Sequence, residues 1–131
     1  MRPRRSALYM PAANMRAMDK ARDLQCDAVI FDLEDAVAVA SKEQARRNVA
    51  QQIAAGGYGQ RELIIRVNGL DTPWGSEDLR ACARLPIDAL LFPKVSSRTY
   101  VEEIDALVQE HNPDLPIWIM IETPTALIDM E

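Results

Sequence analysis

Apolar segments that end in charged residues recur along this chain. Four of its five apolar runs are followed by an acidic or a basic side chain, and these four side chains are Asp32, Arg66, Lys94 and Glu122. Charged groups are almost never buried without a partner, so the repeated placement indicates one shared polar surface. In a parallel α/β sheet that surface is the carboxyl edge, where ligands bind.

The apolar runs alternate with segments of helical periodicity. We expect five strands, over residues 6–10, 28–33, 63–67, 89–92 and 117–121. Four helices are expected between them, starting after Asn14, ending at Gly56-Gly57, and covering 76–84 and 99–111. Strands that are apolar at nearly every position are buried on both faces, as in a parallel sheet covered by helices.

This order of elements fits an open doubly wound sheet or part of a barrel. A nucleotide-binding open sheet needs a glycine-rich turn after its first strand, and here that turn is Pro11-Ala12-Ala13-Asn14. We therefore predict a TIM (β/α)8 barrel. A complete barrel takes about 250 residues, so this chain covers about its first half.

Composition narrows the class of protein. The chain has 131 residues, of which 48% are hydrophobic and 27% charged, and this favours a single soluble domain over residues 1–131. A net charge of -5 argues against nucleic-acid binding. No run approaches the roughly 20 apolar residues that span a bilayer, so no membrane partner is expected. The apolar stretch after Arg5 breaks at Pro11, which excludes a signal peptide and favours a cytoplasmic protein.

Glu122 and Arg66 are the strongest candidates for chemistry. A carboxylate at a strand tip suits Mg²⁺, although a helix cap or an ion pair explains Glu122 equally well. The planar guanidinium of Arg66 matches a carboxylate or a developing enolate oxygen. The alternative, which is compatible with this role, is a buried salt bridge from Arg66 to Glu34 or Asp35.

The acidic segment Asp32-Leu33-Glu34-Asp35 cannot direct all of its carboxylates to one site, because side chains alternate along a strand. Glu34 and Asp35 lie past the strand end and form the better pair, while Asp32 is a candidate partner for a basic residue. Lys94 is a candidate anion-binding group, but a lone lysine at a strand end is more often a member of an ion pair.

Six short motifs carry a family resemblance. They are Arg5-Ser6-Ala7-Leu8-Tyr9-Met10-Pro11, Asp32-Leu33-Glu34-Asp35-Ala36-Val37, Lys42 with Ala45-Arg46, Arg66-Val67-Asn68, Pro93-Lys94-Val95 and Ile121-Glu122-Thr123. In order and spacing they resemble the citrate lyase beta subunit and malyl-CoA lyase (HpcH/HpaI aldolase-like) family. The resemblance implies a TIM barrel that uses Mg²⁺ to cleave a 3-hydroxyacyl thioester into an acetyl thioester and a 2-oxo acid.

The resemblance also implies roles by position. Glu122 resembles the first of two carboxylate metal ligands, and the second, an Asp, is expected beyond the end of this chain. Arg66 resembles the group that steadies the substrate carbonyl or enolate oxygen. Glu34 and Asp35 resemble acids that hold metal-bound water and orient Arg66, and Arg5 resembles a contact at the mouth of the first strand. With Lys94, Arg5 and Arg66 are the expected substrate-binding residues.

We therefore expect the N-terminal part of a carbon-carbon lyase acting on a CoA- or acyl-carrier-linked hydroxyacid of citryl, malyl or citramalyl type. Two alternatives stay open, a non-catalytic fragment or remnant of that barrel and a metal-dependent aldolase acting on free 2-oxo acids. Half a barrel leaves sheet edges unpaired, so we expect a homo-oligomer.

Overall fold

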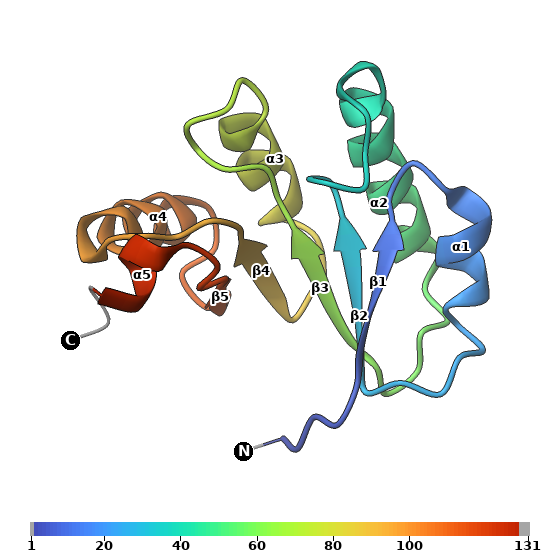
Figure 1. Cartoon of the computed structure of the whole chain (residues 1–131). Coiled ribbons are helices and arrows are strands. Elements are labelled where there is room, and N and C mark those ends of the chain that lie inside the picture. Colours follow the sequence, from blue (N-terminus) through green and yellow to red (C-terminus); the bar gives the residue numbers. More distant parts are fainter. Residues whose placement is uncertain (1, 129–131) are drawn as a thin grey trace.

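A computed structural model describes residues 2–128 of the chain, and strands and helices alternate through all of it (Figure 1). The elements are β1 (Ala7–Pro11), α1 (Met15–Lys20), β2 (Ala28–Asp32), the 3₁₀ helix η1 (Val39–Ser41), α2 (Lys42–Ala55), β3 (Glu62–Arg66), α3 (Gly75–Cys82), β4 (Ala89–Phe92), α4 (Arg98–His111), β5 (Ile117–Ile119) and α5 (Pro124–Ile128).

The five strands form one parallel sheet in the order β1-β2-β3-β4-β5. Each strand therefore pairs with its neighbours in sequence. A doubly wound sheet reverses its strand order at a switch point, and this sheet does not, which confirms the choice against that fold. The register pairs Asp32 on β2 with Arg66 on β3. The carboxyl ends of both strands thus bring opposite charges together.

The sheet has two different faces. Alternate strand residues such as Val29, Phe31 and Ile65 pack with the helices, in one cluster that contains buried side chains from α1, α2, α3 and α4. The intervening residues, such as Ile30 and Ile64, form a second cluster with Trp118, and no helix contributes to it in the described part of the chain. One face is therefore covered by helices, and the other is the face that a barrel would enclose.

Most expected boundaries are confirmed to within two residues. Asn14 accepts a hydrogen bond from the Ala17 amide as the N-cap of α1, and α2 ends at Gly56, which has a φ of 68°. The helix expected to start after Asn14 is short, since α1 ends at Lys20.

The expected total of four helices is too small, because residues 2–128 also contain η1 and α5. Both follow strand-end loops, where a few residues carry little periodic signal. None of the helices over residues 2–128 is long and apolar enough to cross a bilayer.

Candidate functional site

Arg66 lies at the carboxyl edge of the sheet and is held by Asp32. Nε of Arg66 donates to Oδ1 of Asp32 at 2.8 Å, and Nη2 donates to Oδ2 at 2.7 Å. Arg66 is 9% exposed and Asp32 is 1% exposed, so this two-point ion pair is buried. The guanidinium carbon also lies 4.9 Å from the centre of the Tyr9 ring. Two of the three guanidinium nitrogens are thereby committed to Asp32, and Nη1 is directed elsewhere.

Asp32 also shapes the loop that follows β2. Its carboxylate accepts hydrogen bonds from the backbone amides of Glu34 at 2.9 Å and Ala36 at 3.0 Å. Burial by itself raises the pKa of Asp32, but the hydrogen bonds from Arg66 and the two amides, with the Arg66 charge, hold the pKa below its ordinary value. The hydrogen bonding between Arg66 and Asp32, together with the charges of Asp32 and Glu34, raises the pKa of Arg66.

Glu34 lies between two cations. Its Oε2 accepts from Nζ of Lys94 at 2.8 Å, and its Oε1 lies 3.4 Å from Nη1 of Arg66. This second contact is an ion pair without hydrogen-bond alignment, because Oε1 is buried and has no hydrogen-bond partner within residues 2–128. Nη1 of Arg66 donates one hydrogen bond, to Sδ of Met120 at 3.5 Å, so its second N–H is left beside the Glu34 oxygen.

Lys94 adopts a left-handed backbone conformation, with a φ of 52°, and among residues 2–128 it is the one non-glycine residue with positive φ. Such strain concentrates at functional sites. The hydrogen bond and charge of Glu34 raise the pKa of Lys94, and the charges of Asp35 and Glu122 add to the effect.

Asp35 and Glu122 lie at the rim of this cluster. Oδ1 of Asp35 is 3.7 Å from Nζ of Lys94, and the Asp35 side chain is 68% exposed. Glu122 follows β5, is exposed, and is close enough to Lys94 to affect its pKa. The structure thus brings Arg66, Glu34, Lys94, Asp35 and Glu122 to the same edge of the sheet.

The residues at this edge fit an Mg²⁺ ion that takes only one or two of its ligands from the protein and the rest from water. Over residues 2–128 no three His, Cys, Asp or Glu side chains lie close enough to hold a metal ion by themselves. Mg²⁺ commonly keeps several waters and is bound through one or two carboxylates. Glu122 supplies one exposed carboxylate, and Oε1 of Glu34, although buried, makes no hydrogen bond within residues 2–128.

Two expectations about these residues need correction. Arg5 was expected at the mouth of the first strand with the other substrate-binding residues. It precedes β1, and its guanidinium and backbone amide bind Asp27, which precedes β2, so Arg5 lies at the amino edge. Glu34 and Asp35 were expected to orient Arg66, but Arg66 is oriented mainly by Asp32. The parallel register places Asp32 and Arg66 directly opposite each other.

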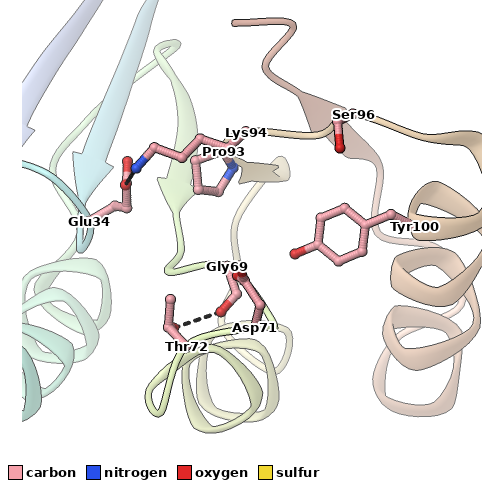
Figure 2. A pocket seen from close by; sticks show the side chains of 8 residues that line it. All are labelled: Glu34, Gly69, Asp71, Thr72, Pro93, Lys94, Ser96 and Tyr100. Carbon is pink, nitrogen blue, oxygen red and sulfur yellow. Dashed lines mark hydrogen bonds and ion pairs between the residues drawn. The ribbon is translucent and has the colours of Figure 1, made fainter. Parts of the chain in front are cut away.

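A cavity of about 330 Å³ lies beside the cluster, between the loops that follow β3 and β4 (Figure 2). Figure 2 shows Lys94 reaching across to Glu34 on one side and the Tyr100 hydroxyl directed into the cavity from the other. That hydroxyl accepts a hydrogen bond from the Leu70 amide at 2.9 Å. Asp71, Thr72 and Ser96 add further polar groups, so the cavity is lined largely by hydrogen-bonding residues.

A buried polar network beneath the cluster was not foreseen from the sequence. It joins Lys42 and Arg46 on α2 to Asn68 after β3 and to Asp78 on α3. Lys42, Asn68 and Asp78 are all less than 9% exposed. The spacing of Lys42 and Arg46, which puts both on one helix face, was the available signal. Asn68, which binds Lys42, and Asp78, which binds Arg46, are far along the chain and could not be identified from spacing.

The chain is similar in sequence to proteins that are named as enzymes. Residues 5–131 match the family model for HpcH/HpaI aldolase/citrate lyase. A (3S)-malyl-CoA thioesterase of Cereibacter sphaeroides is 49% identical over 127 residues, which are 97% of this chain and 43% of that protein. A citrate lyase subunit beta of Leuconostoc mesenteroides is 36% identical over 109 residues, covering 83% of this chain and 36% of that protein.

A solved structure agrees with these matches. The citrate lyase beta subunit of M. tuberculosis, complexed with oxaloacetate and magnesium, superposes with a TM-score of 0.74 at 27% identity, over 93% of this chain and 49% of that one. The chain spans less than half the length of the curated relatives described above.

Proposed function

The chain belongs to the HpcH/HpaI aldolase/citrate lyase family, and from this membership we infer that it contributes to a Mg²⁺-dependent lyase acting on a CoA- or carrier-linked 3-hydroxyacyl thioester. Cleavage gives an acetyl thioester and a 2-oxo acid. Relatives named for malyl-CoA and for citrate lyase support this substrate class. The M. tuberculosis neighbour, complexed with oxaloacetate and magnesium, supports the metal and the 2-oxo acid.

The reaction breaks one carbon-carbon bond. The substrate hydroxyl loses its proton to a base, its oxygen becomes the keto oxygen of the 2-oxo acid, and the bond electrons move to the thioester as an enolate. A proton then returns to the enolate carbon. In our proposal Nη1 of Arg66 faces the substrate carbonyl or enolate oxygen, on which negative charge develops. The other two guanidinium nitrogens of Arg66 are held by Asp32. The pKa of Arg66 is raised, so this donor stays charged throughout.

Bound Mg²⁺ would act as a Lewis acid toward the oxygens of the 2-oxo acid. Glu122 would hold it from this chain, together with a second carboxylate from outside the chain. Glu34 would orient water beside it through Oε1, while Lys94 fixes the other carboxylate oxygen at 2.8 Å. Asp35, at the exposed rim, adds negative charge near the same position.

The observation that carries the proposal is the pairing of a buried, pre-oriented Arg66 with an unsatisfied Glu34 oxygen at the sheet edge where Glu122 also lies. We test it with Glu122→Gln in the complete protein, assayed with malyl-CoA and Mg²⁺ for 2-oxo acid release. Turnover should fall at least about 100-fold, because the amide is a poor ligand for a hard cation.

Glu102→Gln is the matched control, because Glu102 is an exposed carboxylate on α4 whose partner is Arg98. This variant should keep full activity. Wild-type turnover in Glu122→Gln, or turnover that survives complete removal of Mg²⁺ by a chelator, contradicts the proposal.

Hydrolysis of the thioester is a second candidate, favoured by the relative at 49% identity that is named a thioesterase. The products separate the two reactions. A lyase releases a 2-oxo acid and keeps CoA esterified, whereas a thioesterase releases the free CoA thiol and the hydroxyacid. Titration of thiol and of 2-oxo acid in the same reaction assigns the activity.

We further propose that residues 1–131 form the N-terminal part of a single closed barrel domain, and that the complete protein is a homo-oligomer. The sequential strand order supports the barrel, as does the second face of the sheet, to which no helix contributes within residues 2–128.

A further inference from the structure

Lys42 is a buried ammonium group that the proposed reaction does not use. It is 6% exposed, and Nζ donates to the carbonyl oxygens of Leu33 at 3.1 Å and Glu34 at 3.0 Å and to Oδ1 of Asn68 at 2.8 Å. These three bonds use every N–H of the ammonium group. Burying a cation is costly unless it is fully hydrogen-bonded, so the three acceptors fix Nζ in one position.

The loops that follow two neighbouring strands meet at this nitrogen. Leu33 and Glu34 follow β2, and Asn68 follows β3. One acceptor is the carbonyl of Glu34 itself, while the amide of Glu34 donates to Asp32 at 2.9 Å. The backbone of Glu34 is therefore held at its carbonyl by Lys42 and at its N–H by Asp32.

Asn68 extends the anchor to a third element. Its Nδ2 donates to the Leu33 carbonyl at 3.0 Å and to Oδ2 of Asp78 at 2.6 Å, and Oδ1 of Asp78 accepts from Nε of Arg46 at 2.9 Å. Arg46 lies one helical turn after Lys42 on α2. Fully satisfied polar networks in a low-dielectric interior are rigid, so α2 and α3 together define where the loop of Glu34 lies.

We propose that Lys42 is a positioning residue that fixes the backbone of Glu34, so that the Glu34 carboxylate stays between Arg66 and Lys94. The catalytic part of this inference rests on the proposed lyase function. The structural part does not, and the two are tested separately.

The structural test is amide hydrogen exchange of the complete protein with the substitution Lys42→Met, which keeps the chain length and removes the donors. The amides of residues 34–37 should exchange about tenfold faster, while exchange elsewhere is unchanged. Arg61→Met is the matched control, because Arg61 also donates to backbone carbonyls, those of Leu24 and Tyr58, but precedes β3 at the opposite edge. It should leave residues 34–37 unaffected.

Two exchange results overturn the proposal. One is wild-type exchange at residues 34–37 in Lys42→Met. The other is a uniform acceleration across the chain, which means that Lys42 contributes stability alone.

The catalytic test is a double-mutant cycle. Lys42→Met should lower kcat about 10- to 100-fold, as loss of a supporting contact does, with KM for the thioester within about twofold. In a Glu34→Gln background the same substitution should cause no further loss, because Lys42 acts through Glu34. Fully additive losses overturn the proposal. If the wild-type protein cleaves no thioester, the proposed function fails while the exchange result still decides the role of Lys42.

Lys42→Arg keeps the experiment decisive if Lys42→Met does not fold. The arginine retains the charge, but its planar fork cannot bring one nitrogen to three acceptors. Faster exchange at residues 34–37 and a reduced kcat are expected, to a smaller extent than in Lys42→Met. Wild-type exchange and kcat in this variant overturn the proposal.

Discussion

At the residue scale, Asp32 supports both stability and the site. It joins β2 to β3 through Arg66 and caps the loop that carries Glu34. Removing one member of a buried ion pair leaves the other uncompensated, and this typically costs several kcal/mol. The residue is therefore more than a partner for a basic group, the role that its place in the sequence indicated.

We expect Asp32→Asn to lower the free energy of unfolding by about 3 kcal/mol at pH 7. Because the folded-state pKa of Asp32 is lowered, its contribution is complete above the unfolded pKa, near 4, and is lost as the pH falls through the folded pKa. The difference between wild type and variant, measured by urea unfolding at pH 7, 4 and 3, should shrink toward acid. A difference that is constant over this range contradicts the assignment.

At the element scale, α3 begins against the loop that lines the cavity. A Cβ on Gly75 would lie 2.1 Å from the carbonyl oxygen of Gly69 and 2.8 Å from Cα of Leu70. Both are backbone atoms that cannot move without shifting the loop. Gly69 lines the cavity with Asp71 and Thr72, so the start of α3 fixes one wall of it (Figure 2).

Gly75→Ala should therefore destabilise the protein by about 3 kcal/mol, as overpacking does, and should lower the melting temperature. Ser76→Ala, at the exposed neighbouring position of α3, is the control and should stay close to wild type. Equal melting temperatures for the two variants would show that the loop accommodates the methyl group.

The helices and strands were predictable where the local sequence alone determines the structure of a segment. β4 was expected at residues 89–92 and is found there, and the N-cap at Asn14 and the helix end at Gly56 are confirmed. The carboxyl-edge cluster followed from strand ends alone. The polar network around Lys42 could not be foreseen, because its hydrogen bonds join α2, α3 and two loops that only the folded chain brings together.

At the scale of the whole molecule, residues 2–128 leave β1 and β5 as unpaired edges of the sheet. Leu8, Tyr9 and Ile119 on these strands are between 37% and 45% exposed. Unpaired parallel edges with apolar side chains are templates for association. The same feature supports both a closed barrel and self-association of an incomplete one.

Expressed by itself, the 131-residue chain should therefore associate in a concentration-dependent way in analytical ultracentrifugation. Leu8→Lys, which places a charge on the β1 edge, should weaken this association. Val39→Lys is the control, because Val39 is an apolar residue that is 67% exposed on η1 and is not part of an edge strand. A chain that stays monomeric at all concentrations contradicts the expectation.

The strand order also has a consequence for biosynthesis. Because each strand after β1 pairs with the one translated just before it, the sheet can be assembled in the direction in which the ribosome releases the chain. Each new strand would meet the edge of the preceding strand, which has already left the ribosome. The ion pair between Asp32 and Arg66 could form as soon as β3 emerges. The ion pair between Glu34 and Lys94 could form once β4 has followed. The site would thus be built one contact at a time during translation.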